Sequence, residues 1–243
     1  MISARDKKAR RSKGLVGRFS DLDIGVVSGL AGYVASLKPV IWNRMGQGFT
    51  LVQGRVSKWD DVSGNGNHML QSIALSRPVV QPDGSLLFDG LNGYLRAVFA
   101  LAQPSTVYML VKQITWTLSR RLFDSVGTSS ALRQGETSPG INSFAGVAVS
   151  AQNNGLAIGV YGTVSVVFNG SHSSLQVNNG LASDEFGGSQ AFDGVTLGNA
   201  GGTPPGLPGN VQIAEFVAYR GAHDSIQRSL LHRYLMTLGQ VSP

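Results

Sequence analysis

The sequence contains no cysteine, which excludes a disulfide framework and a thiolate metal site. Charged residues make up only 14% of the 243 residues, and no apolar segment is long enough to span a bilayer, so we expect no membrane contact. The four histidines lack metal-binding spacing, and no G-x-S-x-G elbow, phosphate-binding loop or run of paired catalytic carboxylates occurs. These absences predict a protein without enzymatic activity and without a cofactor.

Glycine is abundant instead, with 32 residues, and Gly, Asn and Pro turns separate short apolar segments. These segments alternate apolar and polar residues, or are rich in β-branched and aromatic side chains, as strands are. Residues 24–37 contain three glycines, which favours an extended segment over a helix. The polar residues 126–142 are predicted to form a long loop. We predict about a dozen strands, among them residues 56–59, 85–88, 106–116, 145–149, 156–161, 164–168 and 211–219.

The end of the chain has a helical pattern. Asp224 is a favourable N-cap, and Gly239 is a favourable stop. Between them, apolar residues recur at helical spacing at positions 226, 230, 231, 234, 235 and 238. Many short strands and one terminal helix predict an all-β fold, a two-sheet antiparallel jelly-roll sandwich with one C-terminal helix.

The net charge of +6 belongs to the first 18 residues, which hold seven basic residues and one acidic residue. The remaining 225 residues hold 13 basic and 13 acidic residues. We interpret residues 1–23 as an extended basic arm and residues 24–243 as the folded domain. Such an arm is typical of contacts with nucleic acid, an anionic surface or a partner protein, although a solvated tail explains it equally well. The expected anchoring residues are Arg5, Lys7, Lys8, Arg10, Arg11, Lys13 and Arg18.

The segment from Trp59 to Gln71 combines dense turn signals with oxygen-bearing side chains. Its carboxylates and amides are ligands that calcium accepts, so a calcium site is one interpretation. The preferred interpretation is that the same side chains bond to nearby backbone groups and tighten the loop. The residues concerned are Asp60, Asp61, Asn65 and Asn67.

Contact surfaces for a ligand or partner are expected in the loops 126–142 and 198–210, because loops on rigid scaffolds carry function. In the second loop the polar candidates are Asn199, Thr203 and Asn210. Trp42, Trp59 and Trp116 lie in strand-like runs, so they are predicted to be core residues and not sugar-stacking platforms.

Several short motifs, in this order along residues 24–240, resemble landmarks of the laminin-G-like, concanavalin A-like jelly-roll domains of bacterial and phage proteins. They are Gly29-Leu30 with Tyr33, V-S-K-W-D-D with S-G-N-G-N-H, F-D-G before Tyr94-Leu95, F-N-G-S before V-N-N-G, and the final strand with Tyr234-Leu235. The resemblance implies a two-sheet antiparallel sandwich that binds glycans or proteins, sometimes with calcium. Residues 1–18 lie outside it.

From the basic arm and this resemblance we predict a non-enzymatic bacteriophage virion protein, a capsid decoration or tail-associated subunit made in the host cytoplasm. Its expected partners are other virion proteins and further copies of itself, and the arm could also contact nucleic acid. The alternative is a carbohydrate-binding module that recognises host-surface glycans. A polysaccharide-degrading enzyme is the third hypothesis.

Overall fold

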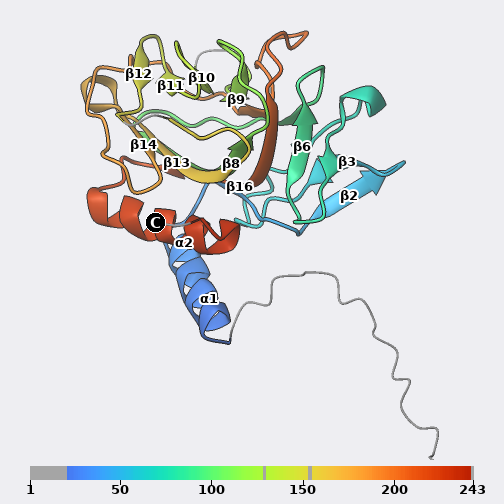
Figure 1. The fold of residues 1–243 in the computed structure, drawn as a ribbon, viewed down its shortest axis with the longest axis horizontal. Coiled ribbons are helices and arrows are strands. Elements are labelled where there is room, and N and C mark those ends of the chain that lie inside the picture. Colours follow the sequence, from blue (N-terminus) through green and yellow to red (C-terminus); the bar gives the residue numbers. More distant parts are fainter. Residues whose placement is uncertain (1–20, 128–129, 153–154, 242–243) are drawn as a thin grey trace, which may run out of the picture.

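The computed structural model describes residues 21–127, 130–152 and 155–241. Two antiparallel β-sheets face each other, and two helices lie on the outer side of one of them (Figure 1). The predicted antiparallel β-sandwich is therefore confirmed. No helix in the described part of the chain is long and apolar enough to cross a membrane.

One sheet has seven strands. The strand β16 pairs with β8 along one edge, and along its other edge with β6 at Asn210–Ile213 and with β1 at Phe216–Ala218. The strands, in order across the sheet, are β14 (Ser174–Val177), β13 (Tyr161–Phe168), β8 (Ser105–Gln113), β16 (Asn210–Arg220), β6 (Leu86–Asp89) and β5 (Val79–Val80), with β1 (Ile41–Asn43) beside β16.

The other sheet has nine strands, and no described helix covers its outer face (Figure 1). The strands are, in order, β12 (Ala148–Ser150), β11 (Ile141–Phe144), β10 (Ala131–Gln134), β9 (Arg121–Asp124), β15 (Val195–Leu197), β7 (Leu95–Ala97), β4 (Met69–Leu70), β3 (Arg55–Trp59) and β2 (Phe49–Val52). Two 3-10 turns, η1 (Ala74–Ser76) and η2 (Gly170–His172), lie in the connections.

Alternate residues of both sheets point inward and form the main core. Trp59, Phe88, Phe123, Phe168 and Phe216 are all at most 1% exposed. Each large aromatic side chain buries on the order of 150–250 Å², so this layer supplies most of the apolar burial that holds the two sheets together.

The predicted C-terminal helix is confirmed as α2 (Ser225–Gly239). Asp224 accepts a hydrogen bond from the Gln227 amide, and the Gln227 side chain accepts one from the Asp224 amide, which completes a capping box. The helix ends at Gly239, and the left-handed residue after it is Gln240. Leu231, Tyr234 and Leu235 are buried against the seven-stranded sheet.

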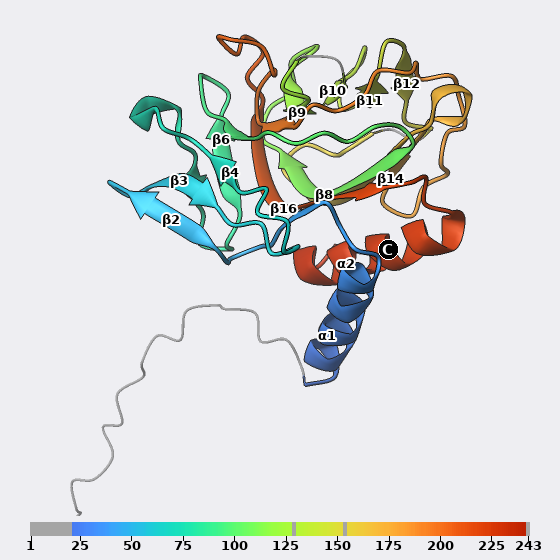
Figure 2. The ribbon, with the colours of Figure 1, turned by 180° about the vertical axis from the view of Figure 1, so that it is seen from behind.

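The prediction of an extended segment at residues 24–37 is wrong, because Asp21–Ser36 form the helix α1. Figures 1 and 2 show α1 beside α2, on the same side of the sandwich. Val34 is fully buried, and Leu30, Tyr33 and Leu37 pack against the same cluster at helical spacing. This tertiary packing outweighs the low helix propensity of the three glycines.

The prediction of one long loop at residues 126–142 is also wrong. The segment contains β10 and the first residues of β11, joined by a tight turn. Residues 156–160, predicted as the start of a strand, form no named strand, and β13 begins at Tyr161. The sequence did not indicate β10 and β11 as strands because they lack a regular apolar alternation. Several of their buried residues are polar, namely Gln134, Asn142 and Ser143.

A bulge in β16 places a carboxylate between the sheet and α2. The register against β8 shifts between Ile213 and Glu215, so Ala214 is an extra residue. Glu215 consequently faces α2, where it is 1% exposed. It accepts hydrogen bonds from Trp42 Nε1 at 2.6 Å, from the Met45 amide at 2.9 Å and from the Tyr234 hydroxyl at 2.6 Å.

We expect the variant Glu215→Gln to lower the free energy of unfolding by about 2 kcal/mol. An amide nitrogen would replace one acceptor oxygen, and one of the three buried donors would lose its partner. The matched control is Glu185→Gln, because Glu185 is exposed and accepts one side-chain bond from Gln152; its effect is expected to stay within about 0.5 kcal/mol. Urea denaturation compares the two, and equal effects would contradict the expectation.

The second expectation concerns pH. Burial lowers the pKa of His223 and of His232 to about 4, and His232 bonds to the hydroxyls of Thr163 and Ser165. Because the unfolded chain binds protons more readily than these buried rings, their stabilisation is complete above pH ~6.5 and is lost as the pH falls towards 4.

The contribution of His232 is isolated by comparing the protein with His232→Gln, because burial raises the pKa of Glu215 and so gives that group the opposite pH dependence. We expect the variant to reduce the slope of unfolding free energy against pH between 4 and 6.5 by up to about 1.4 kcal/mol per pH unit. His172→Gln, at an exposed ring, serves as the control. An unchanged slope in His232→Gln would refute the assignment.

Candidate functional site

The predicted anchoring residues Arg5, Lys7, Lys8, Arg10, Arg11, Lys13 and Arg18 lie outside the residues that the structure describes. The arm therefore stays a prediction from the sequence.

The structure brings the four candidate calcium ligands together in one loop, but their polar atoms bond to the protein itself. The Asp61 carboxylate accepts four hydrogen bonds, from the Trp42, Ser63 and Asn67 amides and from the Ser63 hydroxyl. Asn65 and Asn67 both donate their side-chain amides to the Val40 carbonyl, and Asp60 pairs with Lys58 at 2.9 Å. This geometry agrees with the loop-tightening interpretation.

The three candidates of the second loop do not form a common surface. Asn199 is 1% exposed, and its side chain accepts hydrogen bonds from the Ala200 and Leu207 amides, so it shapes the loop. Asn210 begins β16, and its carbonyl accepts the Ile114 amide. Thr203 is exposed.

The tryptophans divide into two groups. Trp42 and Trp59 are buried, as predicted. Trp116 is half-buried and lies after the end of β8, so the prediction that it belongs to a strand is wrong. Its indole Nε1 donates a hydrogen bond to the Gly140 carbonyl at 3.0 Å, which makes it part of the support of the β10–β11 turn.

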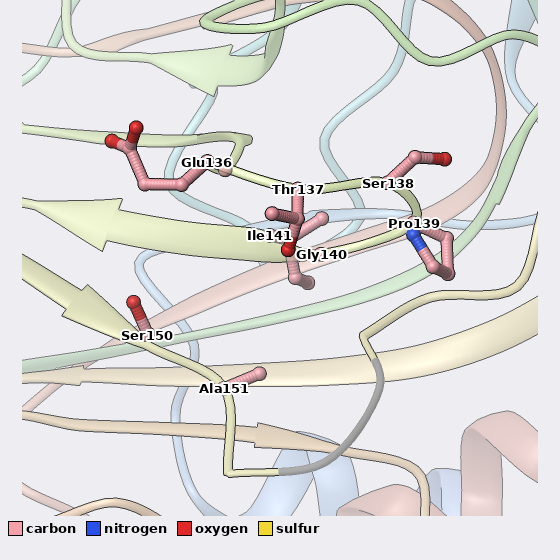
Figure 3. Close-up of a pocket in the computed structure, with 9 residues that line it drawn as sticks. Glu136, Thr137, Ser138, Pro139, Gly140, Ile141, Ser150 and Ala151 are labelled. Carbon is pink, nitrogen blue, oxygen red and sulfur yellow. The ribbon is translucent and has the colours of Figure 1, made fainter.

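A cleft of about 450 Å³ lies between this turn and the end of β12. Figure 3 shows the turn residues on one side and Ser150 and Ala151 on the other. The turn side of the cleft belongs to residues 126–142, the first of the two predicted contact loops. The sequence had not indicated any individual residue in that loop. Its lining consists of Gly135, Glu136, Thr137, Ser138, Pro139, Gly140, Ile141, Ser150 and Ala151.

Buried amides fix the backbone of the turn. Gln113 donates its side-chain amide to the Pro139 carbonyl at 3.0 Å, and Gln134 donates to the Gln113 side-chain oxygen at 2.7 Å. Within the turn, the Gly140 amide bonds to the Thr137 carbonyl at 2.6 Å. A Cβ at position 140 would lie 2.6 Å from that carbonyl oxygen, so the turn requires glycine there.

Four polar side chains project from this rigid support. Among the described residues, none of them has a hydrogen bond or an ion pair with the protein, and all four residues are exposed. They supply one carboxylate and three hydroxyl groups on Glu136, Thr137, Ser138 and Ser150. A set of this kind can both accept and donate hydrogen bonds to a polar ligand.

An arginine lies on the outer sheet face near the cleft. Arg133 pairs across the strands with Asn142, which in turn pairs with Ser150. Its Nε donates to the Asn142 side-chain oxygen at 2.7 Å, and its guanidinium lies 4.8 Å from the centre of the Phe144 ring. Burial and the neighbouring Arg121 lower the pKa of Arg133, whereas Glu136 acts to raise it.

Comparison with known proteins gives the fold but no family. No protein-family model matches the sequence, and no curated protein matches it significantly. Solved structures with a similar fold include an α-L-arabinofuranosidase variant soaked with 4-nitrophenyl α-L-arabinofuranoside (TM-score 0.58, 12% identity, 84% of this chain and 60% of that one). An arabinofuranosidase in complex with arabinofuranosyl-α-1,2-xylobiose gives a TM-score of 0.55 at 12% identity and covers 83% and 59%.

The sialidase of Trypanosoma rangeli is also similar, with a TM-score of 0.57, 12% identity, and coverage of 90% of this chain and 39% of the sialidase. The chain therefore spans about 60% of the arabinofuranosidases and about 39% of the sialidase. At these identities the similarity is one of fold.

Two predictions are corrected by these matches. The prediction of a bacteriophage virion protein is wrong, since the three similar structures named above are glycosidases and none of them is described as a virion component. The exclusion of enzymatic activity is wrong for the same reason, because absent motifs in the sequence do not exclude a fold that glycosidases share.

We expect Asp61→Ala to lower the free energy of unfolding by about 2–4 kcal/mol, because the buried Trp42 amide and three further donors lose their acceptor. The control Asp60→Ala removes an exposed ion pair and should cost less than about 1 kcal/mol. The melting temperature of the unmodified protein should be the same in EDTA and in millimolar Ca²⁺. A rise of several degrees on adding Ca²⁺ would show that the loop binds metal.

Proposed function

We propose that this chain is a carbohydrate-binding β-sandwich domain of the laminin-G-like, concanavalin A-like type, which binds glycan in the cleft beside Glu136. The observation that carries the proposal is the group of four side chains without partners in the protein, held on a turn whose backbone is fixed from below. Sugars present many hydroxyl groups, and a carboxylate with neighbouring hydroxyls matches them in donors and acceptors.

The fold supports the proposal, since the similar structures include an arabinofuranosidase holding a trisaccharide and a sialidase holding sialic acid. The position of the cleft supports it too. The outer face of the seven-stranded sheet lies under the two helices, whereas the nine-stranded sheet and its connecting turns are open to a ligand. A glycan could therefore reach the turn without any rearrangement of the sandwich.

The test is binding of the purified protein to an array of neutral and acidic oligosaccharides, followed by titration calorimetry on the best ligand. We expect Glu136→Ala to weaken binding by roughly 10- to 100-fold, because a charge-assisted hydrogen bond is lost. Ser150→Ala is expected to weaken it by about 3- to 10-fold, since it removes one neutral hydrogen bond from the opposite side of the cleft.

Two controls keep the test specific. Glu185→Ala removes another exposed carboxylate and should leave affinity unchanged, and Thr203→Ala tests the competing loop at residues 198–210. Loss of binding in Thr203→Ala but not in Glu136→Ala would move the site to that loop. Absence of binding across the array would refute the proposed function. Released reducing sugar, measured in the same incubation, would show that the domain also cleaves what it binds.

A further inference from the structure

We infer that the cleft selects neutral glycans and discriminates against acidic ones, with Glu136 as the residue that sets this selectivity. The inference rests on the proposed function and specifies the chemical class of its ligand. It separates two kinds of ligand that are named for the similar structures, a neutral arabinofuranosyl-xylobiose and the anionic sialic acid.

The charge of the cleft lining favours a neutral ligand over an acidic one. Among the described residues that line it, Glu136 alone is ionisable, and the others contribute hydroxyls, backbone groups and apolar surface. The Glu136 carboxylate has no ion-pair partner within the described residues. Its two oxygens can accept hydrogen bonds from sugar hydroxyls, whereas a sugar carboxylate placed there would be repelled by a like charge.

The two arginines that face each other on the neighbouring strands make their contacts outside the cleft. Arg133 does not line the cleft; it bonds to Asn142 and stacks on Phe144. Arg121, directly opposite it across the strands, pairs with the buried Asp124 at 3.0 Å and donates to the Ser119 carbonyl. A site built for an acidic sugar would instead place a guanidinium fork against the ligand, where it could form two parallel bonds to the carboxylate.

The three hydroxyl groups fit the same ligand class. Thr137 and Ser138 lie on the turn, and Ser150 lies across the cleft from them (Figure 3). Each can donate one hydrogen bond and accept others, so together with Glu136 they suit the hydroxyls and ring oxygens of an uncharged sugar.

The experiment compares two pairs of ligands that differ in charge. One pair is arabinofuranosyl-α-1,2-xylobiose and glucuronosyl-α-1,2-xylobiose, and the other is lactose and sialyllactose. We expect the protein to bind the neutral member of a pair at least about tenfold more tightly. This ratio should shrink as salt is raised from low to molar concentration, because salt screens the repulsion at an exposed site.

Glu136→Gln keeps the size and hydrogen-bonding reach of the side chain but removes its charge. We expect it to reduce the neutral-to-acidic ratio to within about twofold, mainly by improving binding of the acidic ligand. Glu185→Gln, a charge change at an exposed carboxylate in another loop, should leave the ratio as in the unmodified protein. Circular dichroism and the melting temperature establish that both variants are folded.

The outcomes separate the two proposals. Tighter binding of the acidic ligands, equal binding of both members, or an unchanged ratio in Glu136→Gln would overturn the selectivity while leaving glycan binding in place. If the protein binds none of the four ligands and no glycan on the array, glycan binding is overturned, and the selectivity with it.

Discussion

The buried carboxylate of Glu215 is the interaction on which the helix side of this sandwich depends. It is almost fully buried, yet it receives hydrogen bonds from Trp42 on β1, from the backbone at Met45 and from Tyr234 on α2. A charge in such a place is tolerated only while its donors stay in position, and so the carboxylate fixes where β16, the chain after β1, and α2 lie relative to one another. The bulge at Ala214 makes this arrangement possible. Without it, regular alternation would turn Glu215 into the apolar layer between the sheets.

This arrangement makes the two outer faces of the sandwich unequal. On the helix side, the polar groups under α2 bond to one another: His232 bonds to Thr163 and Ser165, and His223 bonds to Tyr108. These contacts stabilise the docking of α2 against the sheet. At the β10–β11 turn the buried amides act differently, because Gln113 at the end of β8 and Gln134 on β10 support the turn from below while its polar side chains stay exposed. Buried polar contacts therefore stabilise the docking of α2 on one side and hold the β10–β11 turn on the other.

The sequence predicted the elements whose signals are local. The last strand and α2 carry strong periodicity and a capping residue, and the loop from Asp60 to Asn67 has the side chains that bond to nearby backbone. The failures have tertiary causes. The helix α1 forms despite its glycines because Val34 and Leu37 pack against α2 and the sheet. The strands β10 and β11 were missed because half of their buried residues are polar, and some of these have partners distant in sequence, such as Gln113 for Gln134. The sequence could suggest the loop as a contact surface, which stays a prediction, but it could not bring Glu136 and Ser150 together, since β11 lies between them in the chain.

The support beneath Glu136 also bears on the proposed binding by this turn. A flexible loop would have to be ordered by its ligand, and that entropic cost would reduce affinity. Here Trp116, Gln113 and the Gly140–Thr137 bond have already fixed the backbone when the protein folds. The exposed side chains have only their own rotamers to lose on binding, so a few hydrogen bonds to a sugar can yield a net gain. Among the described cleft residues a single carboxylate would then suffice to set the charge of the proposed ligand, because neither Arg133 nor Arg121, the arginines that face each other on the neighbouring strands, lines the cleft.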